Sequence, residues 1–342
     1  MQENKEPLYG KTLAELEALC AEISLPKFTA KQIANWLYVK HVTSIEQMTN
    51  LSQKARTQLL ATHSIGLCEP LKVSEASDGT KKYLFATSKG CFIEAAYIPT
   101  PDRATLCVSS QAGCRMGCTF CATGKQGLQH SLSAGEILNQ VASIPESGKI
   151  TNVVFMGMGE PLDNADNVLK ALEVMTAPWG YAWSPSRITL STAGVGRELR
   201  RFLDATSVHL AISLHNPYSN ERAEIMPIEK AYPIAEIMEI LREYDFSRQR
   251  RLSFEYIVMS GKNNHPHHIK ELCKLLNGVK CRINLIKFHK IPGSPYFSPD
   301  DEKMVRFRDT LTAKGIHTTI RTSRGEEIQA ACGLLSTMET TL

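Results

Sequence analysis

The sequence lacks any long hydrophobic run. No stretch of its 342 residues approaches the roughly 20 consecutive apolar residues that a membrane-crossing helix needs. Residues 1–7 are polar and do not resemble the apolar centre of a secretory signal peptide. Internal repeats and low-complexity tracts are also lacking. We therefore expect a cytoplasmic protein that does not act at a membrane.

Strong charge of either sign is lacking as well. The 39 lysines and arginines face 35 aspartates and glutamates, for a formal net charge of +4. This mild surplus is compatible with a nucleic-acid partner without indicating one. The 10 cysteines are expected to be reduced thiols rather than a disulfide framework, because cytoplasmic proteins rarely keep disulfides.

The larger part of the chain contains alternating strand and helix patterns. The expected strands are residues 105–109, 151–155, 187–191, 208–213, 252–258 and 281–288. The expected helices between them are residues 133–141, 166–175, 198–203, 234–243 and 267–276. Ser133 and Glu136 have the spacing of a capping box at the first of these helices. The alternation predicts an α/β fold with a parallel sheet, a partial (βα)6 barrel that is open on one side.

The first part of the chain has a different pattern. Up to about residue 65, apolar residues such as Leu16, Leu19 and Cys20 recur at helical spacing, which makes Cys20 a core residue. Residues 70–98 contain short alternating runs separated by Asp-Gly and Lys-Gly turns. We expect a mainly helical accessory domain over residues 1–90 with a short β-rich connection, and the barrel over residues 91–342.

Three closely spaced cysteines form the most informative motif. Cys114, Cys118 and Cys121 have the spacing Cys-x3-Cys-x2-Cys. Thiolates hold iron–sulfur clusters, and three ligands instead of four leave one iron open to a small molecule. The alternatives are buried packing cysteines or a zinc site, but zinc normally takes a fourth cysteine or histidine nearby, for which His130 is the candidate. The motif favours a cluster with an open iron.

Further candidate ligands follow the expected strands. Active sites of barrels gather at the C-terminal strand ends. Gly159 and Glu160 follow the second strand, Ser191 ends the third, and Ser213 and His215 end the fourth. Glycine permits close backbone approach to a ligand, and a glutamate can accept a hydrogen bond from an ammonium group. His215 is either a ligand contact or a structural histidine.

Two cysteines and a histidine group lie outside these motifs. Cys332 is flanked by small residues near the C-terminus, a context that leaves a thiol accessible. Cys107 has the context of a buried strand residue. His265, His267 and His268 resemble a metal-binding tract, but the polar residues before them favour the start of a helix.

Together these motifs resemble the RlmN family of RNA adenine-C2 methyltransferases, in the radical S-adenosylmethionine (SAM) superfamily, and the related Cfr resistance enzymes. The resemblance covers nearly the whole chain. It includes the three-cysteine motif, the Gly-Met-Gly-Glu-Pro-Leu run that starts at Gly157, and the Ala-Ala-Cys-Gly run that ends at Gly333. It implies two cofactors, a [4Fe–4S] cluster and SAM, with two SAM molecules consumed per methylation.

The resemblance also implies roles for particular residues. Cys114, Cys118 and Cys121 would bind the cluster. Cys332 would carry the methyl group, Cys107 would be its partner thiol, and Glu94 would be a proton acceptor. The SAM contacts would be Gly159, Glu160, Ser191, Ser213, Leu214 and His215, together with His289, which stands where the family often has asparagine.

The reaction implied by the resemblance is methylation of adenosine carbon 2. This carbon is electron-poor and cannot attack the methyl group of SAM directly, so radical chemistry through an S-methylcysteine and a covalent RNA–protein adduct is expected. The implied substrates are 23S rRNA at the peptidyl-transferase centre and the anticodon loop of tRNA, with the base extruded from its stack. A reductant such as flavodoxin and a monomeric protein are also expected.

Two other interpretations remain open from the sequence. One is methylation of carbon 8, as in the Cfr branch, although Pro161 after the Gly-Glu pair favours carbon 2. The other is a non-catalytic RNA-binding module that holds zinc or an iron–sulfur cluster. Iron-free protein with stoichiometric zinc would support that module.

Overall fold

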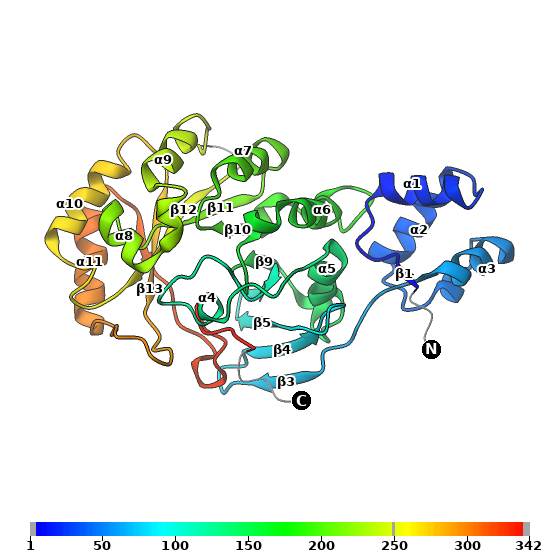
Figure 1. Ribbon diagram of the computed structural model, residues 1–342, viewed down its shortest axis with the longest axis horizontal. Coiled ribbons are helices and arrows are strands. Elements are labelled where there is room, and N and C mark those ends of the chain that lie inside the picture. The colour runs from blue at the N-terminus through cyan, green and yellow to red at the C-terminus, as the bar shows by residue number, and fades with distance from the viewer. Residues whose placement is uncertain (1–4, 248–249, 338–342) are drawn as a thin grey trace.

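The computed structural model describes residues 5–247 and 250–337 (Figure 1). One ten-stranded sheet runs through the larger part of the chain, in the order β14-β13-β12-β11-β10-β9-β6-β5-β4-β3. All neighbours from β6 to β14 pair in parallel, whereas β3, β4, β5 and β6 pair antiparallel. The parallel strands with outer helices confirm the expected α/β fold with a parallel sheet.

The parallel strands lie where the sequence predicted them, with one addition. Their bounds are β6 (Arg103–Cys107), β9 (Asn152–Phe155), β10 (Ile188–Thr192), β11 (His209–Ser213), β12 (Leu252–Val258), β13 (Arg282–Lys287) and β14 (Thr318–Ile320). The short β14 is a seventh parallel strand that the sequence analysis did not predict, because three residues are too few for a visible alternation.

Helices connect and cover these strands (Figure 1). They are α4 (Ala122–Gln126), α5 (Ala134–Ala142), α6 (Ala165–Thr176), α7 (Gly196–Ala205), α8 (Ser219–Ile225), α9 (Ile234–Arg242), α10 (Pro266–Leu275) and α11 (Asp301–Ala313). The capping box predicted for α5 is present, since Ser133 accepts from the Glu136 amide at 3.2 Å and the Glu136 carboxylate accepts from the Ser133 amide at 2.8 Å. Helices α4, α8 and α11 were not predicted.

The N-terminal unit is helical, as expected. It contains β1 (Glu6–Pro7), α1 (Leu13–Glu22), α2 (Phe28–Tyr38), α3 (Gln53–Thr62) and β2 (His63–Ser64). Cys20 is fully buried in its core, which confirms the prediction for that thiol. The unit lies beside α5 and α6 (Figure 1). It packs there tightly, because a Cβ at Gly10 would stand 2.3 Å from the backbone nitrogen of Gly135.

The antiparallel strands join this helical unit to the barrel. They are β3 (Lys72–Glu75), β4 (Lys81–Ala86) and β5 (Phe92–Thr100), and they continue the same sheet as the parallel strands. Residue 90 lies in the turn between β4 and β5, which pair from Lys81 to Ala86. We therefore propose that the helical domain ends near residue 65, rather than at the expected boundary of residue 90.

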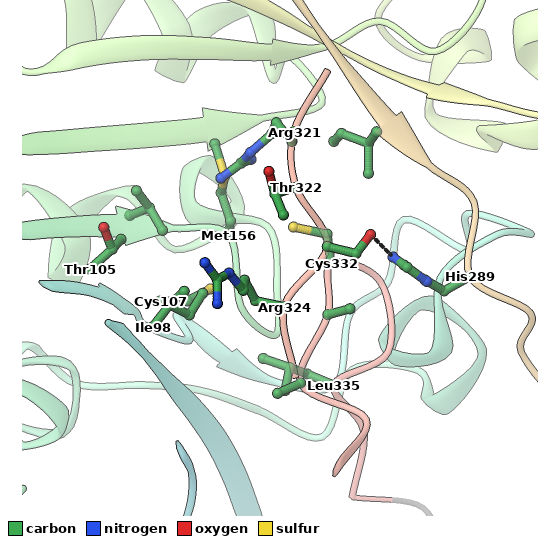
Figure 2. A pocket seen from close by; sticks show the side chains of 15 residues that line it. Ile98, Thr105, Cys107, Met156, His289, Arg321, Thr322, Arg324, Cys332 and Leu335 are labelled. Carbon is green, nitrogen blue, oxygen red and sulfur yellow. Dashed lines mark hydrogen bonds between the residues drawn. The ribbon is translucent and has the colours of Figure 1, made fainter. Parts of the chain in front are cut away.

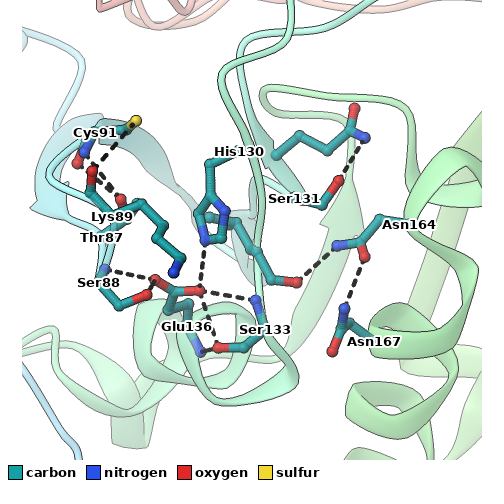
Figure 3. A network of polar contacts seen from close by, with 12 residues as sticks. Thr87, Ser88, Lys89, Cys91, His130, Ser131, Ser133, Glu136, Asn164 and Asn167 are labelled. Carbon is teal, nitrogen blue, oxygen red and sulfur yellow. Dashed lines mark hydrogen bonds and ion pairs between the residues drawn. The ribbon is translucent and has the colours of Figure 1, made fainter.

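A polar network fixes the β4–β5 turn against the barrel (Figure 3). The carboxylate of Glu136, at the start of α5, accepts hydrogen bonds from the amide of Ser88 at 2.8 Å and from the amide of Ser133 at 2.8 Å. His130 in β8 (His130–Ser131) lies 3.3 Å from the same carboxylate. Strand β8 pairs with β7 (Gln111–Ala112), just before the cysteine motif. The antiparallel extension is thus connected to the loop that carries the three cysteines.

Candidate active site

The three cysteines of the motif lie in a compact loop between β7 and α4. Gly113, with φ of +74°, begins it, and a Cβ there would stand 1.7 Å from the carbonyl oxygen of Gly127. Cys121 is the residue before the first turn of α4. Burial raises the pKa of Cys114 to about 12 and also raises the pKa values of Cys118 and Cys121. The loop therefore presents three shielded sulfurs that stay protonated thiols unless a metal displaces their protons.

The spacing of these sulfurs suits a cluster better than one zinc ion. In the described part of the chain, the ligand atoms of Glu221, His267 and His268 form the one group of three found within 4.8 Å of one another. The three cysteine sulfurs do not form such a group, so at least two of them lie more than 4.8 Å apart, beyond the about 3.8 Å expected between sulfur ligands of tetrahedral zinc. A cluster suits wider spacing, because each sulfur binds a different iron.

Glu160 connects the end of β9 to the end of β10. Its carboxylate accepts hydrogen bonds from the Leu162 amide at 3.1 Å, the Ala193 amide at 2.8 Å and the hydroxyl of Thr192. Burial raises the pKa of Glu160 to about 7, although these hydrogen bonds oppose the rise. A positively charged group in the adjoining cavity would favour its ionised form.

The glycines before Glu160 have a packing role that the sequence did not reveal. A Cβ at Gly159, which has a φ of +97°, would stand 2.5 Å from the Gln111 side chain. A Cβ at Gly157 would stand 2.7 Å from both the Ser109 hydroxyl and the Val108 carbonyl. These glycines therefore allow the loop after β9 to press against the segment that follows β6, in addition to lining a cavity.

His215 follows β11 and is held in one orientation. Its φ is +54°, and its Nδ1 accepts a hydrogen bond from the Ile257 amide at 3.0 Å. Asn263 donates to its carbonyl oxygen at 2.7 Å. Burial, with a smaller effect of the Arg222 charge, lowers the pKa of His215 to about 3. The ring is therefore neutral, and Nε2 carries the proton and can donate it in a hydrogen bond.

These strand-end residues line one cavity, which we call the strand-end cavity. Gly159, Glu160, Ser191, Ser213 and His215 all line it, together with Cys121 of the cysteine motif. The structure thus brings together most of the residues predicted to contact SAM. Leu214, also predicted to contact SAM, does not line this cavity. Its side chain is fully buried in the core, and its backbone amide donates to the carbonyl oxygen of Glu255 at 3.0 Å.

A second cavity adjoins the first and is named here the thiol cavity. Figure 2 shows Cys107, Cys332 and Arg321 around it. Cys107 is the last residue of β6 and packs against Ala330. Cys332, in the irregular C-terminal segment, lines both cavities, as does Arg321. The structure therefore brings both predicted reactive thiols to one place and puts Cys332 at the junction with the strand-end cavity.

Arg321 provides a cation beside these two thiols. Its guanidinium lies 3.4 Å from the carboxylate of Glu255 and 3.0 Å from the sulfur of Met156. Burial, with the neighbouring Cys332 charge, raises the pKa of Cys107 to about 12, and the charge of Arg321 opposes this rise. With Arg321 beside it, the Cys107 thiol loses its proton more readily than it would in a purely apolar cavity.

Glu94 and His289 lie outside the strand-end cavity. Glu94, on β5, is 5% exposed, and its carboxylate pairs with Lys82 at 2.8 Å and accepts from the Ser336 amide at 3.0 Å. Both oxygens are therefore engaged, and its role as proton acceptor stays a prediction. His289 lines the thiol cavity, where it lies 3.0 Å from the Ser323 hydroxyl (Figure 2).

Arg222 is a positioning residue that the sequence analysis missed. Its fully buried guanidinium donates to the carbonyl oxygens of Ala193, Ser213 and Leu214 at 3.1, 2.9 and 3.0 Å. It also pairs with the buried carboxylate of Glu229. Arg222 thus ties the ends of β10 and β11 together beneath the strand-end cavity.

Sequence signals for the missed residues differ in strength. Glu255 is the one charged residue within the fully buried β12, and that contrast could have pointed to the site. Arg222 lies in a polar helix segment, and Arg321 follows a strand that was itself not predicted. The sequence around either arginine does not distinguish it from an arginine exposed at the surface.

His265, His267 and His268 are not arranged to bind a metal. His268 lies 2.8 Å from the Glu221 carboxylate through Nε2, and its Nδ1 accepts from the His265 amide at 3.2 Å. Because Nδ1 accepts, Nε2 carries the proton and has no lone pair for a metal. The segment begins α10 with a capping box, in agreement with the prediction of a helix start.

Comparison with known proteins identifies the family of this chain. Residues 108–276 match the family model described as the radical SAM superfamily, and residues 7–65 match the ribosomal RNA large subunit methyltransferase N-terminal domain. A radical SAM methyltransferase from Sphaerobacter thermophilus has a similar solved structure, with a TM-score of 0.90, 38% identity, and coverage of 96% of this chain and 99% of that chain. The protein is therefore a radical SAM protein with an appended N-terminal domain.

Full-length relatives define the family more closely. The probable dual-specificity RNA methyltransferase RlmN of Bacteroides fragilis is 56% identical over 97% of each chain. The dual-specificity RNA methyltransferase RlmN of Syntrophobacter fumaroxidans is 44% identical over 96% of this chain and 98% of its own. The chain belongs to the RlmN family of radical SAM RNA methyltransferases.

The cofactors of this family are a [4Fe–4S] cluster and SAM, and the residues present fit both. Three shielded sulfurs with wide spacing suit a cluster that has one open iron. The buried carboxylate of Glu160 and the Nε2–H of His215 line the cavity beside them, where an ammonium group and a hydrogen-bond acceptor of SAM would find partners. The cluster and SAM together supply radical chemistry.

No helix among the described residues is long and apolar enough to cross a membrane.

Proposed function

We propose that this protein methylates carbon 2 of an adenosine in 23S rRNA, at the peptidyl-transferase centre, and in the anticodon loop of tRNA. The observation that carries the proposal is the position of Cys332, which lines both the strand-end cavity and the thiol cavity. A methyl carrier must meet the methyl donor on one side and the substrate base on the other. The names of the full-length relatives support RNA as the substrate class.

In this proposal each thiol has its own role. The Cys332 thiolate accepts a methyl group, so that a sulfur–carbon bond forms as the donor's methyl–sulfur bond breaks. Cys107, which also lines the thiol cavity, takes the carbon 2 proton from the adduct between RNA and protein. The Cys107 sulfur then bonds to the Cys332 sulfur as the bond between the Cys332 sulfur and the transferred carbon breaks. That carbon keeps the electron pair and takes a proton, which leaves it as the methyl group of the released base. The charge of Arg321 opposes the rise in pKa that burial causes at Cys107.

Substitution of the two thiols tests the proposal. We expect Cys332→Ala to abolish RNA methylation, because the methyl carrier is lost. We expect Cys107→Ala to accumulate a covalent RNA–protein adduct on a denaturing gel. The exposed Cys68 provides the matched control, and Cys68→Ala is expected to methylate RNA as the native protein does. Full turnover by Cys332→Ala would contradict the methyl-carrier role.

The position of the methyl group requires a separate measurement. Nucleoside mass spectrometry of rRNA fragments and tRNA treated under anaerobic conditions distinguishes carbon 2 from carbon 8. A product methylated at carbon 8 would overturn the first part of the proposal and leave the thiol roles intact. The cytoplasmic location, the monomeric state and a reductant such as flavodoxin stay predictions from the sequence.

A further inference from the structure

A third cavity lies next to the thiol cavity and is called here the α4 cleft. Its walls come from α4, from the segment after β13, and from the C-terminal segment on both sides of Cys332. His289 lines both the α4 cleft and the thiol cavity. Any chain that places a base in the thiol cavity therefore has the α4 cleft as a neighbouring surface.

Two lysines from different segments make the α4 cleft cationic. Lys125, on α4, donates to the neutral carbonyl of Pro292 at 2.6 Å. Lys290 stands over the ring of Phe297, at 5.7 Å from its centre. In the part of the chain that the structure describes, neither ammonium has a carboxylate within 4.0 Å. Glu326, the one carboxylate on the wall, lies 3.6 Å from His289. Positive charge is thus left available to an anion.

An exposed aromatic ring extends this surface. Phe297 is 63% exposed, and only Phe28 among the other described aromatic side chains is comparably open. A ring of this kind, next to a cation, is the feature on which nucleic-acid bases stack in single-stranded segments. Without such a partner, the apolar surface of the Phe297 ring is exposed to water, which is unfavourable.

We propose that Lys125, Lys290 and Phe297 bind the nucleotide next to the target adenosine, with the lysines on its phosphate and the ring against a base. A base that leaves its stack must bring its flanking phosphates to the mouth of the cavity, and a cation at that point stabilises the extruded form. The inference goes beyond the proposed function, since it rests on RNA as the substrate but not on which carbon is methylated.

The test compares RNA affinity at several salt concentrations. The probe is an RNA stem-loop with the target adenosine in its loop, measured by fluorescence anisotropy. We expect Lys125→Gln/Lys290→Gln to bind about tenfold more weakly, with the slope of log affinity against log salt reduced by about 1 to 2. The charge-preserving Lys125→Arg/Lys290→Arg should recover most of the affinity. Phe297→Ala should weaken binding about fivefold or more, and Phe297→Trp should restore it.

A matched control removes the same charge elsewhere. Lys274, near the end of α10, and Lys314, just after α11, lie on the outer helices, and their double change to glutamine should leave affinity and salt slope nearly unchanged. Alkylation of Cys332 by iodoacetamide should be equal in all variants, which shows that the thiol cavity is intact. Native affinity and slope in Lys125→Gln/Lys290→Gln, or an equal loss in the control, would overturn the inference. A native chain that binds no RNA would contradict the proposed function itself.

Discussion

The two halves of the active site are built in opposite ways. The strand-end half is formed where β9, β10 and β11 end, and buried side chains such as Glu160 and Arg222 join one strand end to the next. The C-terminal half is a segment from residue 321 to 337 whose regular structure is one short helical turn, Glu326–Ile328. The first half is part of the sheet, whereas the second is attached to it.

Individual hydrogen bonds make that attachment. The Ser336 amide donates to Glu94 on β5 at 3.0 Å, and the Gly325 amide donates to Asp78 beside β4 at 3.1 Å. The Thr123 hydroxyl of α4 donates to the Leu335 carbonyl at 2.6 Å. Because separate bonds rather than continuous strand pairing hold it, this segment can rearrange at a lower cost than the strand ends. The difference is that the strand-end residues are held by the sheet, whereas Cys332, which lines two cavities, lies on a segment outside it.

The largest effect is expected from loss of Arg222, in the rigid half. Arg222→Ala leaves Glu229 buried without its partner and frees three carbonyl oxygens at the strand ends. Removal of one member of a buried ion pair costs about 3–5 kcal/mol of unfolding free energy. Urea denaturation followed by circular dichroism measures this loss, and SAM binding should fall with it.

Arg200→Ala is the control for this prediction. Arg200 pairs with Glu243 at the surface, so its loss should leave the urea midpoint nearly unchanged. If the urea midpoint of Arg222→Ala were also nearly unchanged, the strand ends would not depend on the buried guanidinium.

The rigid half is also the half that the sequence predicts best. Apolar β-branched runs mark β9 to β13, and parallel strands bring their C-terminal ends to one edge. Placement of Glu160, Ser191, Ser213 and His215 around one cavity follows from that rule. The cysteine spacing predicts a cluster site without knowledge of the fold, because the three cysteines lie in one loop.

The sequence predicts the attached half poorly, for a physical reason. Residues 321–337 have little periodicity, and their position depends on partners more than 200 residues away, such as Glu94 for Ser336. Arg321 and Arg324 look alike in the sequence, yet Arg321 lines both cavities and Arg324 lines only the thiol cavity. Long-range pairing of this kind has no local signature.

An intermediate effect is expected from Glu94, which anchors the attached half. Glu94→Gln removes the charge that pairs with Lys82 and weakens the bond to Ser336, so we expect a loss of about 2 kcal/mol in unfolding free energy. Hydrogen exchange of residues 330–337 should quicken more than that of β10 or β11. Alkylation of Cys332 should also become several-fold faster.

Glu94→Gln also separates two roles for this carboxylate. Lost methylation together with unchanged hydrogen exchange and unchanged Cys332 alkylation would favour the proton-acceptor role over the anchoring role. The exposed Glu75, 3.5 Å from Lys81, is the control, and Glu75→Gln should change neither measurement.

The smallest effect is expected from Glu136, which fixes the β4–β5 turn that supports Glu94. Burial alone raises the pKa of Glu136, but hydrogen bonds from Ser88 and Ser133 outweigh it and hold the pKa below its ordinary value of 4.5. A carboxyl group whose pKa is lower in the folded state stabilises the fold at neutral pH and loses that contribution as pH falls below about 4.5. Glu136→Gln should therefore cost about 1 kcal/mol of unfolding free energy at pH 7, after allowance for solvent screening, and almost nothing near pH 3.

Urea midpoints of the native protein and of Glu136→Gln across this pH range test this pH dependence. A difference between the midpoints that grows in acid would show that the network does not favour the charged form. Hydrogen exchange at residues 330–337 should change less than in Glu94→Gln, because Glu136 reaches the C-terminal segment only through the antiparallel strands.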